Sequence, residues 1–331
     1  MRIIEGNDID SRLWSKLVKQ SSVATWFQTQ EAYAFFDSLS FLEAFAYAVE
    51  SDGVLKGVVV GYIQKDGGKL KQFFSRRAII LGGPLLADDI SNEELDTLLA
   101  ALKSKLRRKS IYIETRNFND YGRWRSVFEN CRFEYVPHLD FHLKCTNLED
   151  VESRIGKHRR RYIRLSMKNG AKIIEYPTIE NVRDFYSVLD ELYKTKVKSS
   201  LFPICFFEEL FRLASCKYVL IEYEGSIVGG SVCVMLKNKA VYEWFACGKD
   251  GVHRNIHPSS LTKYAGICYA LDNGYKIFDM MGAGKPDEDY GVRDFKAEFG
   301  GDLVEFGRFV HISNTLLYKV GCLGVKLLKK L

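Results

Sequence analysis

Two motifs that recur at almost one spacing constrain the fold of this chain more than any other feature. The pattern Glu-x-acid-Gly-x-aliphatic-x-Gly occupies residues 50–57 and returns at 222–229, 172 positions later. An aromatic motif at 128–135 likewise returns at 299–306, 171 positions later. Unrelated segments are not expected to share an offset, so we infer a tandem duplication of one folding unit. The alternative is coincidence, because acid-Gly hairpin turns are common in proteins.

The expected elements follow the same order in both halves. In the first half, apolar periodicity and turn residues predict helices over 8–19, 30–39, 92–106 and 121–129, and strands over 45–50, 54–64, 70–74, 111–114 and 133–143. In the second half they predict strands over 218–223, 227–236, 240–247, 278–281 and 303–312, a helix over 259–272 and a short helix around Phe295. Helices over 151–170 and 179–193 join the halves. We therefore expect an α+β protein of two layered domains, residues 1–148 and 149–312.

The composition fits two well-packed domains. The chain has 331 residues, of which 47% are hydrophobic and 13% aromatic, enough for two cores. The first ten residues lack the pattern of a secretory signal, and no apolar run approaches the roughly 18 residues of a membrane helix. We therefore expect a cytoplasmic protein. The eight cysteines form no Cys-x-x-Cys pair, which favours buried free thiols over disulfides or a zinc site.

The last segment of the chain, residues 314–331, has the pattern of a basic amphipathic helix. Leucine and valine residues recur on one face, and four lysines lie elsewhere. Such a helix could lie on the inner face of a membrane as a peripheral anchor. We favour the other interpretation, in which residues 313–331 pack back on the first domain.

The stretch from Phe278 to Arg308 is the strongest candidate for a functional site. Its short apolar run ends abruptly in Gly282, Gly284 and Pro286, which predicts a polar loop at the carboxyl end of a core strand. Two cations and two aromatic residues follow within about two helical turns, before a Gly-Gly pair ends the helix. A loop of this composition can close over a ligand.

The same stretch resembles the carboxyl-terminal signature of the FemABX family. The resemblance rests on Phe278-Asp279, Gly282 with Gly284, Phe295-Lys296 and Phe299-Gly300-Gly301. Members of this family are aminoacyltransferases that build peptidoglycan cross-bridges with an amino acid taken from a charged tRNA. The resemblance implies two tandem GNAT-like domains, the fold of acyl-CoA N-acyltransferases, each with a mixed, largely antiparallel sheet flanked by helices. It also implies that Lys296 and the backbone of Phe295 stabilise the reaction intermediate, whereas the alternative for Lys296 is a solvated helix cation.

Further substrate-binding candidates lie around this loop. Tyr242 and Trp244 are two apart in a predicted strand, so they share a face, and they match aromatic residues that line the acceptor site in the family. Core packing would explain both equally well. Asp279 would either orient a ligand or cap the turn after its strand, and Arg293 would either contact substrate or be a surface charge.

Two phenylalanines mark a departure from the family. Members that act on nucleotide-linked muropeptides hold the diphosphate with an arginine and a tyrosine, where this chain has Phe202 and Phe206. Phe35 likewise stands where a lysine is expected. The resemblance therefore implies a more apolar acceptor, with Phe202 and Phe206 in its binding site.

A run of basic residues predicts a surface for a polyanion. Lys157, Arg160, Arg161 and Arg164 share a helix face through i, i+3 and i+4 spacing. Such a stripe suits the phosphates of RNA, here tRNA, and the alternative is a solvated charged face.

A second polar pattern, His138-x-Asp140-x-His142, would place three side chains of metal-ligand type on one strand face. We interpret it as a polar strand face and expect no metal.

Together these features predict a FemAB-type aminoacyl- or acyltransferase that forms an amide on an amine acceptor, in peptidoglycan or cell-envelope biosynthesis. An amine that attacks an ester needs positioning and oxyanion stabilisation rather than a nucleophilic side chain, and the sequence contains no nucleophile motif. The expected donor is aminoacyl-tRNA, with no tightly bound cofactor, and the acceptor is a peptidoglycan precursor or another amine. One alternative is an acyl-CoA-dependent N-acyltransferase, although the segment HRNIHPSS lacks the glycines of a CoA-binding loop. The other is a non-catalytic RNA- or envelope-associated binding protein; the oligomeric state stays open.

Overall fold

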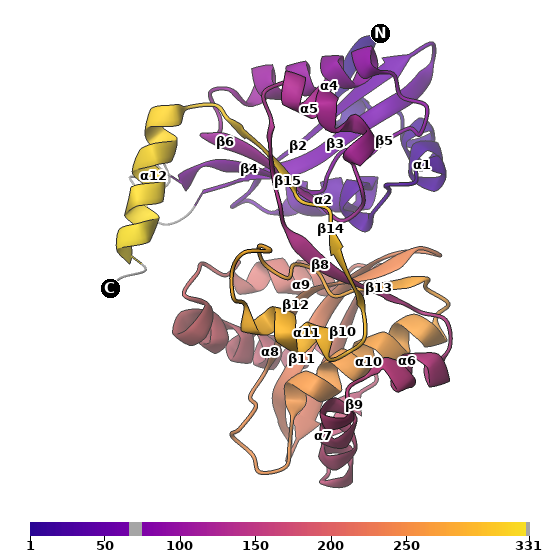
Figure 1. Cartoon of the computed structure of the whole chain (residues 1–331), viewed down its shortest axis with the longest axis vertical. Coiled ribbons are helices and arrows are strands. Elements are labelled where there is room, and N and C mark those ends of the chain that lie inside the picture. The colour runs from indigo at the N-terminus through magenta and orange to yellow at the C-terminus, as the bar shows by residue number, and fades with distance from the viewer. Residues whose placement is uncertain (66–74, 329–331) are drawn as a thin grey trace. The chain divides into compact units, whose positions relative to one another are not determined.

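The computed structural model describes residues 1–65 and 75–328, with side chains as far as residue 322. The strand expected at 70–74 and the last lysines, Lys329 and Lys330, lie outside the described residues. The chain divides into two compact units (Figure 1). The first contains residues 1–138 and the chain from Glu305 onward, and the second contains residues 139–304. None of the described helices is long and apolar enough to cross a membrane.

The first unit is built around a mixed, largely antiparallel sheet. In spatial order its strands are β1 (Arg2–Glu5), β2 (Glu43–Ser51), β3 (Val54–Gln64), β4 (Arg77–Gly82), β6 (Tyr112–Asn117), β15 (Arg308–Ile312) and β7 (Glu134–Val136). β5 (Leu85–Leu86) pairs with β3 outside this order. β4 runs parallel to β6 over six residue pairs, and this parallel pair lies in the middle of the sheet.

Helices cover both faces of this sheet, with α4 on one side and α2 on the other (Figure 1). They are α1 (Ser11–Gln20), α2 (Gln30–Ser38), α4 (Asn92–Leu106), α5 (Arg125–Asn130) and α12 (Thr315–Leu328), with short turns η1 (Gly6–Asp8), η2 (Trp26–Gln28) and η3 (Gly122–Trp124). α4 begins where Ser91 and Glu94 form a reciprocal capping box. Its five leucines between Leu95 and Leu106 follow helical spacing, so they form one buried face against β2 and β3.

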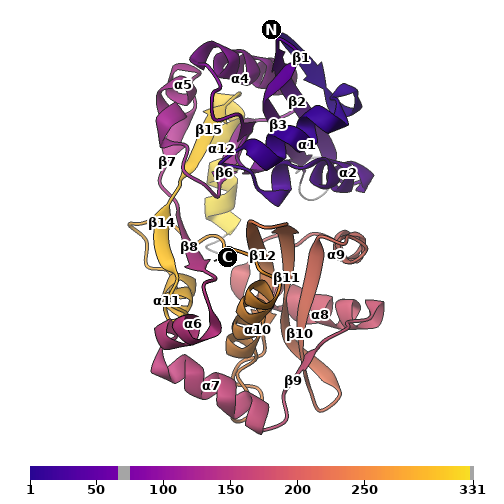
Figure 2. The ribbon, with the colours of Figure 1, turned by 90° about the vertical axis from the view of Figure 1, so that its right-hand side faces the viewer.

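The second unit repeats this design. Its strands, in spatial order, are β9 (Lys172–Ile174), β10 (Cys216–Tyr223), β11 (Ser226–Leu236), β12 (Ala240–Gly248), β13 (Ile277–Asp279), β8 (Leu139–Lys144) and β14 (Asp302–Glu305). Its helices are α6 (Leu148–Arg154), α7 (Lys157–Lys168), α8 (Ile179–Leu192), α9 (Ile204–Phe211), α10 (Pro258–Asp272) and α11 (Gly291–Ala297), with a π-helical turn η4 (Tyr193–Val197) after α8. A Cβ on Gly229 would lie 2.9 Å from Pro258 of α10, and one on its neighbour Gly230 would lie 3.1 Å from Phe185 of α8. The two helices therefore pack closely on opposite faces of the sheet (Figure 2).

The structure confirms the duplication in detail. The two sheets have the same strand order when β1, β2, β3, β4, β6, β15 and β7 are matched with β9, β10, β11, β12, β13, β8 and β14. Asp52 and Gly53 turn the first hairpin with φ angles of 52° and 75°, and Glu224 and Gly225 turn the second with 49° and 75°. Both hairpins also contain a register shift at equivalent positions near the turn. Hairpins that resembled each other only by chance would not be expected to share this irregularity. The structure therefore argues against coincidence as the explanation of the repeated motifs.

The two units exchange one strand each. The strands expected over 133–143 and 303–312 are both interrupted, so each becomes two shorter strands. The first parts, β7 and β14, stay at sheet edges, whereas β15 lies between β6 and β7 and β8 lies between β13 and β14. The chain therefore changes units near residues 138 and 304, and the expected boundaries at 148 and 312 differ from these. The breaks fall at Pro137, which has no N–H for a ladder, and at Gly307, whose φ of 63° turns the chain.

One helix also differs from expectation in detail. The helix expected over 151–170 is divided into α6 and α7 at Gly156, whose N–H donates to the carbonyl oxygen of Glu298 at 2.8 Å. α12 falls in the first unit, where the rings of Tyr318 and Tyr112 meet edge to face at 5.4 Å. The helix thus packs on the sheet strand β6.

Candidate active site

The parallel strands in the middle of the second sheet, β12 and β13, separate after a short paired stretch. β12 and β13 pair over three residues, ending at Tyr242 with Asp279, although β12 continues to Gly248. The equivalent strands of the first sheet, β4 and β6, pair over six residues. The second sheet is therefore split at the carboxyl end of β13, a position where sheets of this kind commonly bind ligands.

The equivalent place in the first unit is filled by side chains. Gln28 Nε2 donates to the carbonyl oxygens of Gly82 and Gly83, both at 2.9 Å. The hydroxyl of Tyr121 donates to the carbonyl oxygen of Pro84 at 2.7 Å, and Gln28 and Tyr121 are both buried. The second unit is therefore the one that we expect to carry the site.

A bulge in β12 coincides with the split. Trp244 is an extra residue in the ladder with β11, and a bulge re-aims the side chains that flank it. Glu243 consequently pairs with the Nζ of Lys263 on α10, whereas Phe245 packs against Phe207 of α9 at 5.1 Å. Burial, together with the charge of Lys296, lowers the pKa of Lys263 well below its ordinary value.

Lys296 lies on α11 and reaches the loop that follows β13. Its Nζ donates hydrogen bonds to the carbonyl oxygens of Met281 at 2.8 Å and Gly282 at 2.9 Å, and the residue is 9% exposed. A protonated amine has three N–H donors, so one is left for a ligand once the described residues have taken two. Burial lowers the pKa of Lys296, and the charges of Asp140 and Asp279 limit this fall. A cation held in this way can stabilise an oxyanion.

Asp279 ends β13 and is fully buried. Its Oδ1 accepts the N–H of Met281 at 2.7 Å, and Met281 has a φ of 57°, a left-handed conformation that is uncommon for a bulky residue. Such strain is frequent at functional sites. Of the two alternatives for Asp279, the structure favours capping of this turn, because a side chain with no exposed surface is not placed to contact a ligand.

Asp140 and His142 join Asp279 from the neighbouring strand β8. His142 is directly opposite Asp279 in the ladder, and its Nε2 lies 3.2 Å from Asp279 Oδ2. Burial disfavours the imidazolium, but Asp279 and Asp140 outweigh it, so the pKa of His142 is raised. Burial and the charge of Asp279 raise the pKa of Asp140 well above its ordinary value.

The motif His138-x-Asp140-x-His142 is thus divided between the units. His138 belongs to the first unit, where its Nε2 lies 2.8 Å from Nη2 of Arg308. Ligand-type atoms of Asp140, His142 and Asp279 lie within 4.8 Å of one another, which would suit a metal by distance. The ammonium of Lys296 already brings positive charge to these carboxylates, so we assign no metal to them.

Arg293 holds the loop between β13 and α11. Its guanidinium donates to the carbonyl oxygens of Ala283 at 2.9 Å, Glu288 at 2.8 Å and Lys285. These bonds commit its donors to shaping the loop, so contact between Arg293 and substrate stays a prediction.

Phe295 precedes Lys296 on α11 and packs within the second unit. Its ring lies 5.2 Å from the ring of Phe299 and 4.5 Å from the guanidinium of Arg159. Its N–H falls in the second turn of α11, where helical i to i−4 bonding takes it up. The role expected for its backbone therefore stays a prediction.

Three of the aromatic candidates form one cluster. Phe206 is fully buried, stacks on Phe202 at 4.3 Å and meets Trp244 edge to face at 5.2 Å. Tyr242 is 3% exposed, so Tyr242 and Phe206 are core residues, and substrate contact by either stays a prediction. Phe202 and Trp244 are half-buried, which places them at the surface of the cluster.

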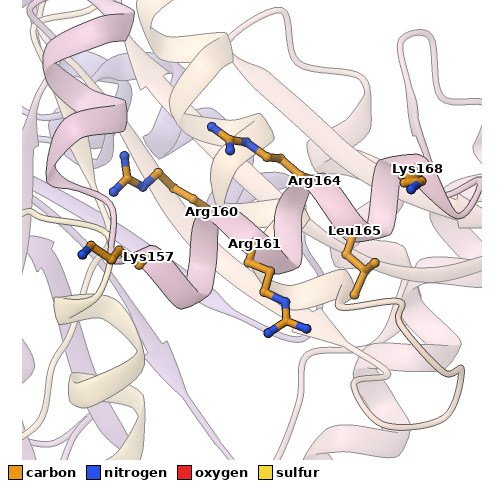
Figure 3. A pocket seen from close by; sticks show the side chains of 6 residues that line it. All are labelled: Lys157, Arg160, Arg161, Arg164, Leu165 and Lys168. Atoms are coloured by element: carbon orange, nitrogen blue, oxygen red, sulfur yellow. The ribbon is translucent and has the colours of Figure 1, made fainter.

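α7 presents the expected basic residues, but they do not all extend from one side of the helix. Lys157, Arg160 and Arg164 extend from one side of the helix and Arg161 from the other, and with Leu165 and Lys168 they line a shallow pocket (Figure 3). None of these five basic residues forms an ion pair with a residue that the structure describes, whereas their neighbour Arg159 pairs with Glu298 at 3.0 Å. Like charges at i, i+3 and i+4 destabilise a helix by a few tenths of a kcal/mol per pair, a cost that a bound polyanion would relieve.

The amino terminus of α10 offers few donors to an anion. Pro258 at its first position has no N–H, the N–H of Ser259 lies 3.4 Å from Oδ1 of Asp250, and the N–H of His257 donates to Oγ of Ser166 at 2.9 Å. A free helix amino terminus binds phosphate well, but here a carboxylate already sits beside it.

Sequence reasoning missed the buried pair of Glu243 and Lys263. Each residue is the one charged side chain in an apolar run, AVYEWFAC and SSLTKYAGICYA. Buried charges are normally paired, so the two runs contain a signal that could have been used. The bulge that turns Glu243 toward α10 has no such signal.

Two sheets of one topology, each layered between helices, are the architecture of paired GNAT-like domains. The solved structure of FemX is 16% identical to this chain, with a TM-score of 0.73 and coverage of 97% of this chain and 99% of that chain. A tandem GNAT protein from the clavulanic acid biosynthesis pathway is 9% identical, with a TM-score of 0.59 and coverage of 95% and 99%. L-PGS from Bacillus licheniformis is 12% identical, with a TM-score of 0.58 and coverage of 98% of both chains. At these identities the likeness shows the fold, and it confirms the expected fold class.

A separate match concerns the carboxyl-terminal part of the chain. The FemAB family model matches residues 212–324, a stretch that contains β12, β13, the loop and Lys296. This match confirms the resemblance to the FemABX family that the sequence motifs predicted. No curated protein sequence matches the chain at a significant level.

Proposed function

We propose that this protein is a FemAB-type acyltransferase that forms an amide on an amine acceptor in peptidoglycan or cell-envelope biosynthesis. The observation that carries the proposal is the placement of Lys296, a buried cation at the split end of β13 with two N–H groups fixed by loop carbonyls. Its third donor would meet the oxyanion that forms when an amine attacks an ester. The family match over the same segment supports this assignment.

The chemistry of such a transfer fits the groups present. The amine nitrogen attacks the carbonyl carbon, the new C–N bond forms, and the bond from that carbon to the leaving oxygen breaks. The proton lost by the nitrogen ends on the leaving oxygen, so no covalent enzyme intermediate is needed. What the protein must supply is positioning and a place for negative charge.

We infer that the donor is an aminoacyl-tRNA. The cations Lys157, Arg160, Arg161 and Arg164 on α7, which form no ion pair within the described part of the chain, support a polyanionic donor. The alternative donor, acyl-CoA, would be expected to place its diphosphate at a free helix amino terminus, and Asp250 disfavours this at α10.

We also infer that the acceptor is apolar or lipid-linked. Phe202 is half-buried beside the aromatic cluster, and a phenyl ring offers no donor to a diphosphate. Leu316 and Val320, 73% and 43% exposed on α12, would suit a protein that works at the inner face of a membrane. Calorimetry should detect weak binding of a nucleotide-linked muropeptide, and tight binding of that soluble form would contradict the inference.

The test of the catalytic assignment is Lys296→Met, which keeps the apolar stem and removes the charge. Transfer of amino acid from tRNA, or of acyl group from CoA, to muropeptide amines should lose about a hundred-fold in kcat with little change in KM, the loss typical of one oxyanion donor. Lys285→Met removes an exposed cation of the same loop and should leave the rate unchanged. A Lys296→Met enzyme with wild-type kcat, or with a raised KM alone, would contradict the proposal.

The test of the donor is the double variant Arg160→Glu/Arg164→Glu. Loss of two phosphate contacts should weaken tRNA binding and reduce the slope of log K against log salt by about 1.4 to 1.8. The matched control, Arg183→Glu/Lys194→Glu, alters two exposed cations, one on α8 and one on η4, that already pair with carboxylates. An equal slope in wild type and Arg160→Glu/Arg164→Glu would contradict the inference and would favour the alternative, in which α7 is a solvated charged face.

A further inference from the structure

Met281 connects two buried groups that the proposed chemistry treats separately. Its N–H donates to Oδ1 of Asp279 at 2.7 Å, and its carbonyl oxygen accepts from Nζ of Lys296 at 2.8 Å. The direction of the Lys296 ammonium group therefore depends on the turn at Met281, and the conformation of that turn depends on Asp279. Asp279 is in turn fixed through its second oxygen, Oδ2, which lies 3.2 Å from Nε2 of His142 on the adjacent strand.

We propose that Asp279, held by His142, is the positioning residue of this site, which fixes the strained Met281 turn and so directs the ammonium of Lys296. Asp279 has no exposed surface, so it acts through Lys296 and does not touch substrate. The signature that contains Asp279 and Lys296 does not include His142, because β8 reaches β13 only through the exchange of strands.

The charge of Asp279 matters as well as its hydrogen bond. A buried ammonium without a counter-charge is costly, and Lys296 faces the carboxylates of Asp140 on β8 and Asp279 on β13. His142 faces the same two carboxylates and, more distantly, Asp302 on β14. Lys263 on α10 faces Lys296 and the same two carboxylates, and it pairs with Glu243. The buried group therefore contains three basic and three acidic side chains, which together can be neutral.

A divalent metal is the competing explanation for these side chains. Their ligand-type atoms are close enough for one, but a dication would repel Lys296 and displace His142 from Asp279. A positioning role needs no further component, since Oδ1 of Asp279 accepts the N–H of Met281. Its Oδ2 lies within ion-pair distance of His142, although this contact lacks the geometry of a hydrogen bond.

The test is Asp279→Asn, in which the amide oxygen can still accept the N–H of Met281 while the charge is lost. We would label the protein with [ε-¹³C]lysine and ring-¹³C histidine and follow Lys296 and His142 by NMR as pH is varied. The pKa of each should fall by about one unit or more, the usual effect of removing an opposite charge at this range. Lys296→Arg and His142→Gln identify the two signals.

Asp190→Asn is the matched control, because Asp190 is a carboxylate on α8 of the same unit, where it pairs with Lys194 of η4. It should leave both titrations unchanged. If Asp279→Asn does not fold, the wild-type titration still decides, since His142 should titrate above the ordinary value of about 6.5. Unshifted titrations in a folded Asp279→Asn protein, or a His142 pKa at or below that value in wild type, would overturn the proposal. So would stoichiometric Zn²⁺ binding that requires both His142 and Asp279.

The catalytic part of this inference rests on the proposed function, but its titrations do not. If Lys296→Met retains full transfer activity while Asp279→Asn still shifts both titrations, the proposed function fails and the positioning of Lys296 stands. If both hold, Asp279→Asn should lower kcat at constant KM and move the alkaline limb of the kcat profile to lower pH, in step with the Lys296 titration.

Discussion

Replacement of one residue of the buried pair Glu243 and Lys263 should destabilise the protein strongly, whereas replacement of both by apolar residues should have a small effect on stability. Their side chains are 2% and 4% exposed, so either charge left alone would lie in the core of the second unit. Removal of one partner of a buried ion pair costs about 3–5 kcal/mol, whereas replacement of both by apolar groups of similar size is often neutral or stabilising. Glu243→Met and Lys263→Met should therefore each be severe, and the double variant should recover most of the loss.

The size of the effect follows from the size of the unit. Residues 139–304 number 166 (304 − 139 + 1), and 1 kcal/mol shifts the Tm of a domain of that size by about 2–4 °C. Each single variant should thus lose roughly 6–20 °C by calorimetry. Lys194→Met, which breaks the exposed pair with Asp190, should cost about 0.5 kcal/mol or less and move Tm by no more than about 2 °C. Single variants that melt like wild type, or a double variant as unstable as either single one, would refute the reasoning.

Three further predictions concern other parts of the chain. Burial alone would raise the pKa of Glu114, but the charges of Arg116 and Arg308 outweigh burial, so the pKa is lowered. The stability that the two arginines contribute through Glu114 is therefore present above the ordinary pKa of 4.5 and is lost as pH falls below it. The difference in Tm between wild type and Glu114→Gln should narrow on acidification, and a constant difference would contradict this. Gly230→Ala places a Cβ 2.7 Å from a backbone oxygen of β10 and should cost about 1–3 kcal/mol, measured by thermal melting, with a wild-type Tm as the contrary result. Arg293→Met frees three loop carbonyls and should speed chymotryptic cleavage within 282–290, which an unchanged cleavage rate would disprove.

Local patterns were enough to predict most elements of the fold. The helix expected over 92–106 is α4 with the same bounds, because its capping box and its leucine spacing are both local signals. The two acid-Gly hairpins were likewise predictable, since the turn chemistry fixes their register. The strand breaks at Pro137 and Gly307 have local causes, but the sheet that receives each following strand was not predictable, because its partner strand is distant in sequence.

The site was predictable only in part for the same reason. Lys296 and its loop lie within one segment, so a local motif indicated both. The approach of Asp140 and His142 to Asp279 depends on the placement of β8 beside β13, which no local pattern specifies. The pairing of Glu243 with Lys263 accompanies a bulge at Trp244, which regular strand alternation does not predict.

The reciprocal placement of β8 and β15 has a consequence for the origin of the chain. Each half lends its last strand to the other half, which is how two copies of a single polypeptide associate by domain swapping. Fusion of the two genes of such a swapped homodimer would retain the exchanged strands, and the two copies could then diverge. One copy would keep the split between its parallel strands, and the other would fill the equivalent place with side chains. Residues 1–146 expressed alone should accordingly form a dimer by sedimentation, in which β8 of each copy occupies the place of β15 between β6 and β7 of the other, and a folded monomer of this fragment would count against a swapped ancestor.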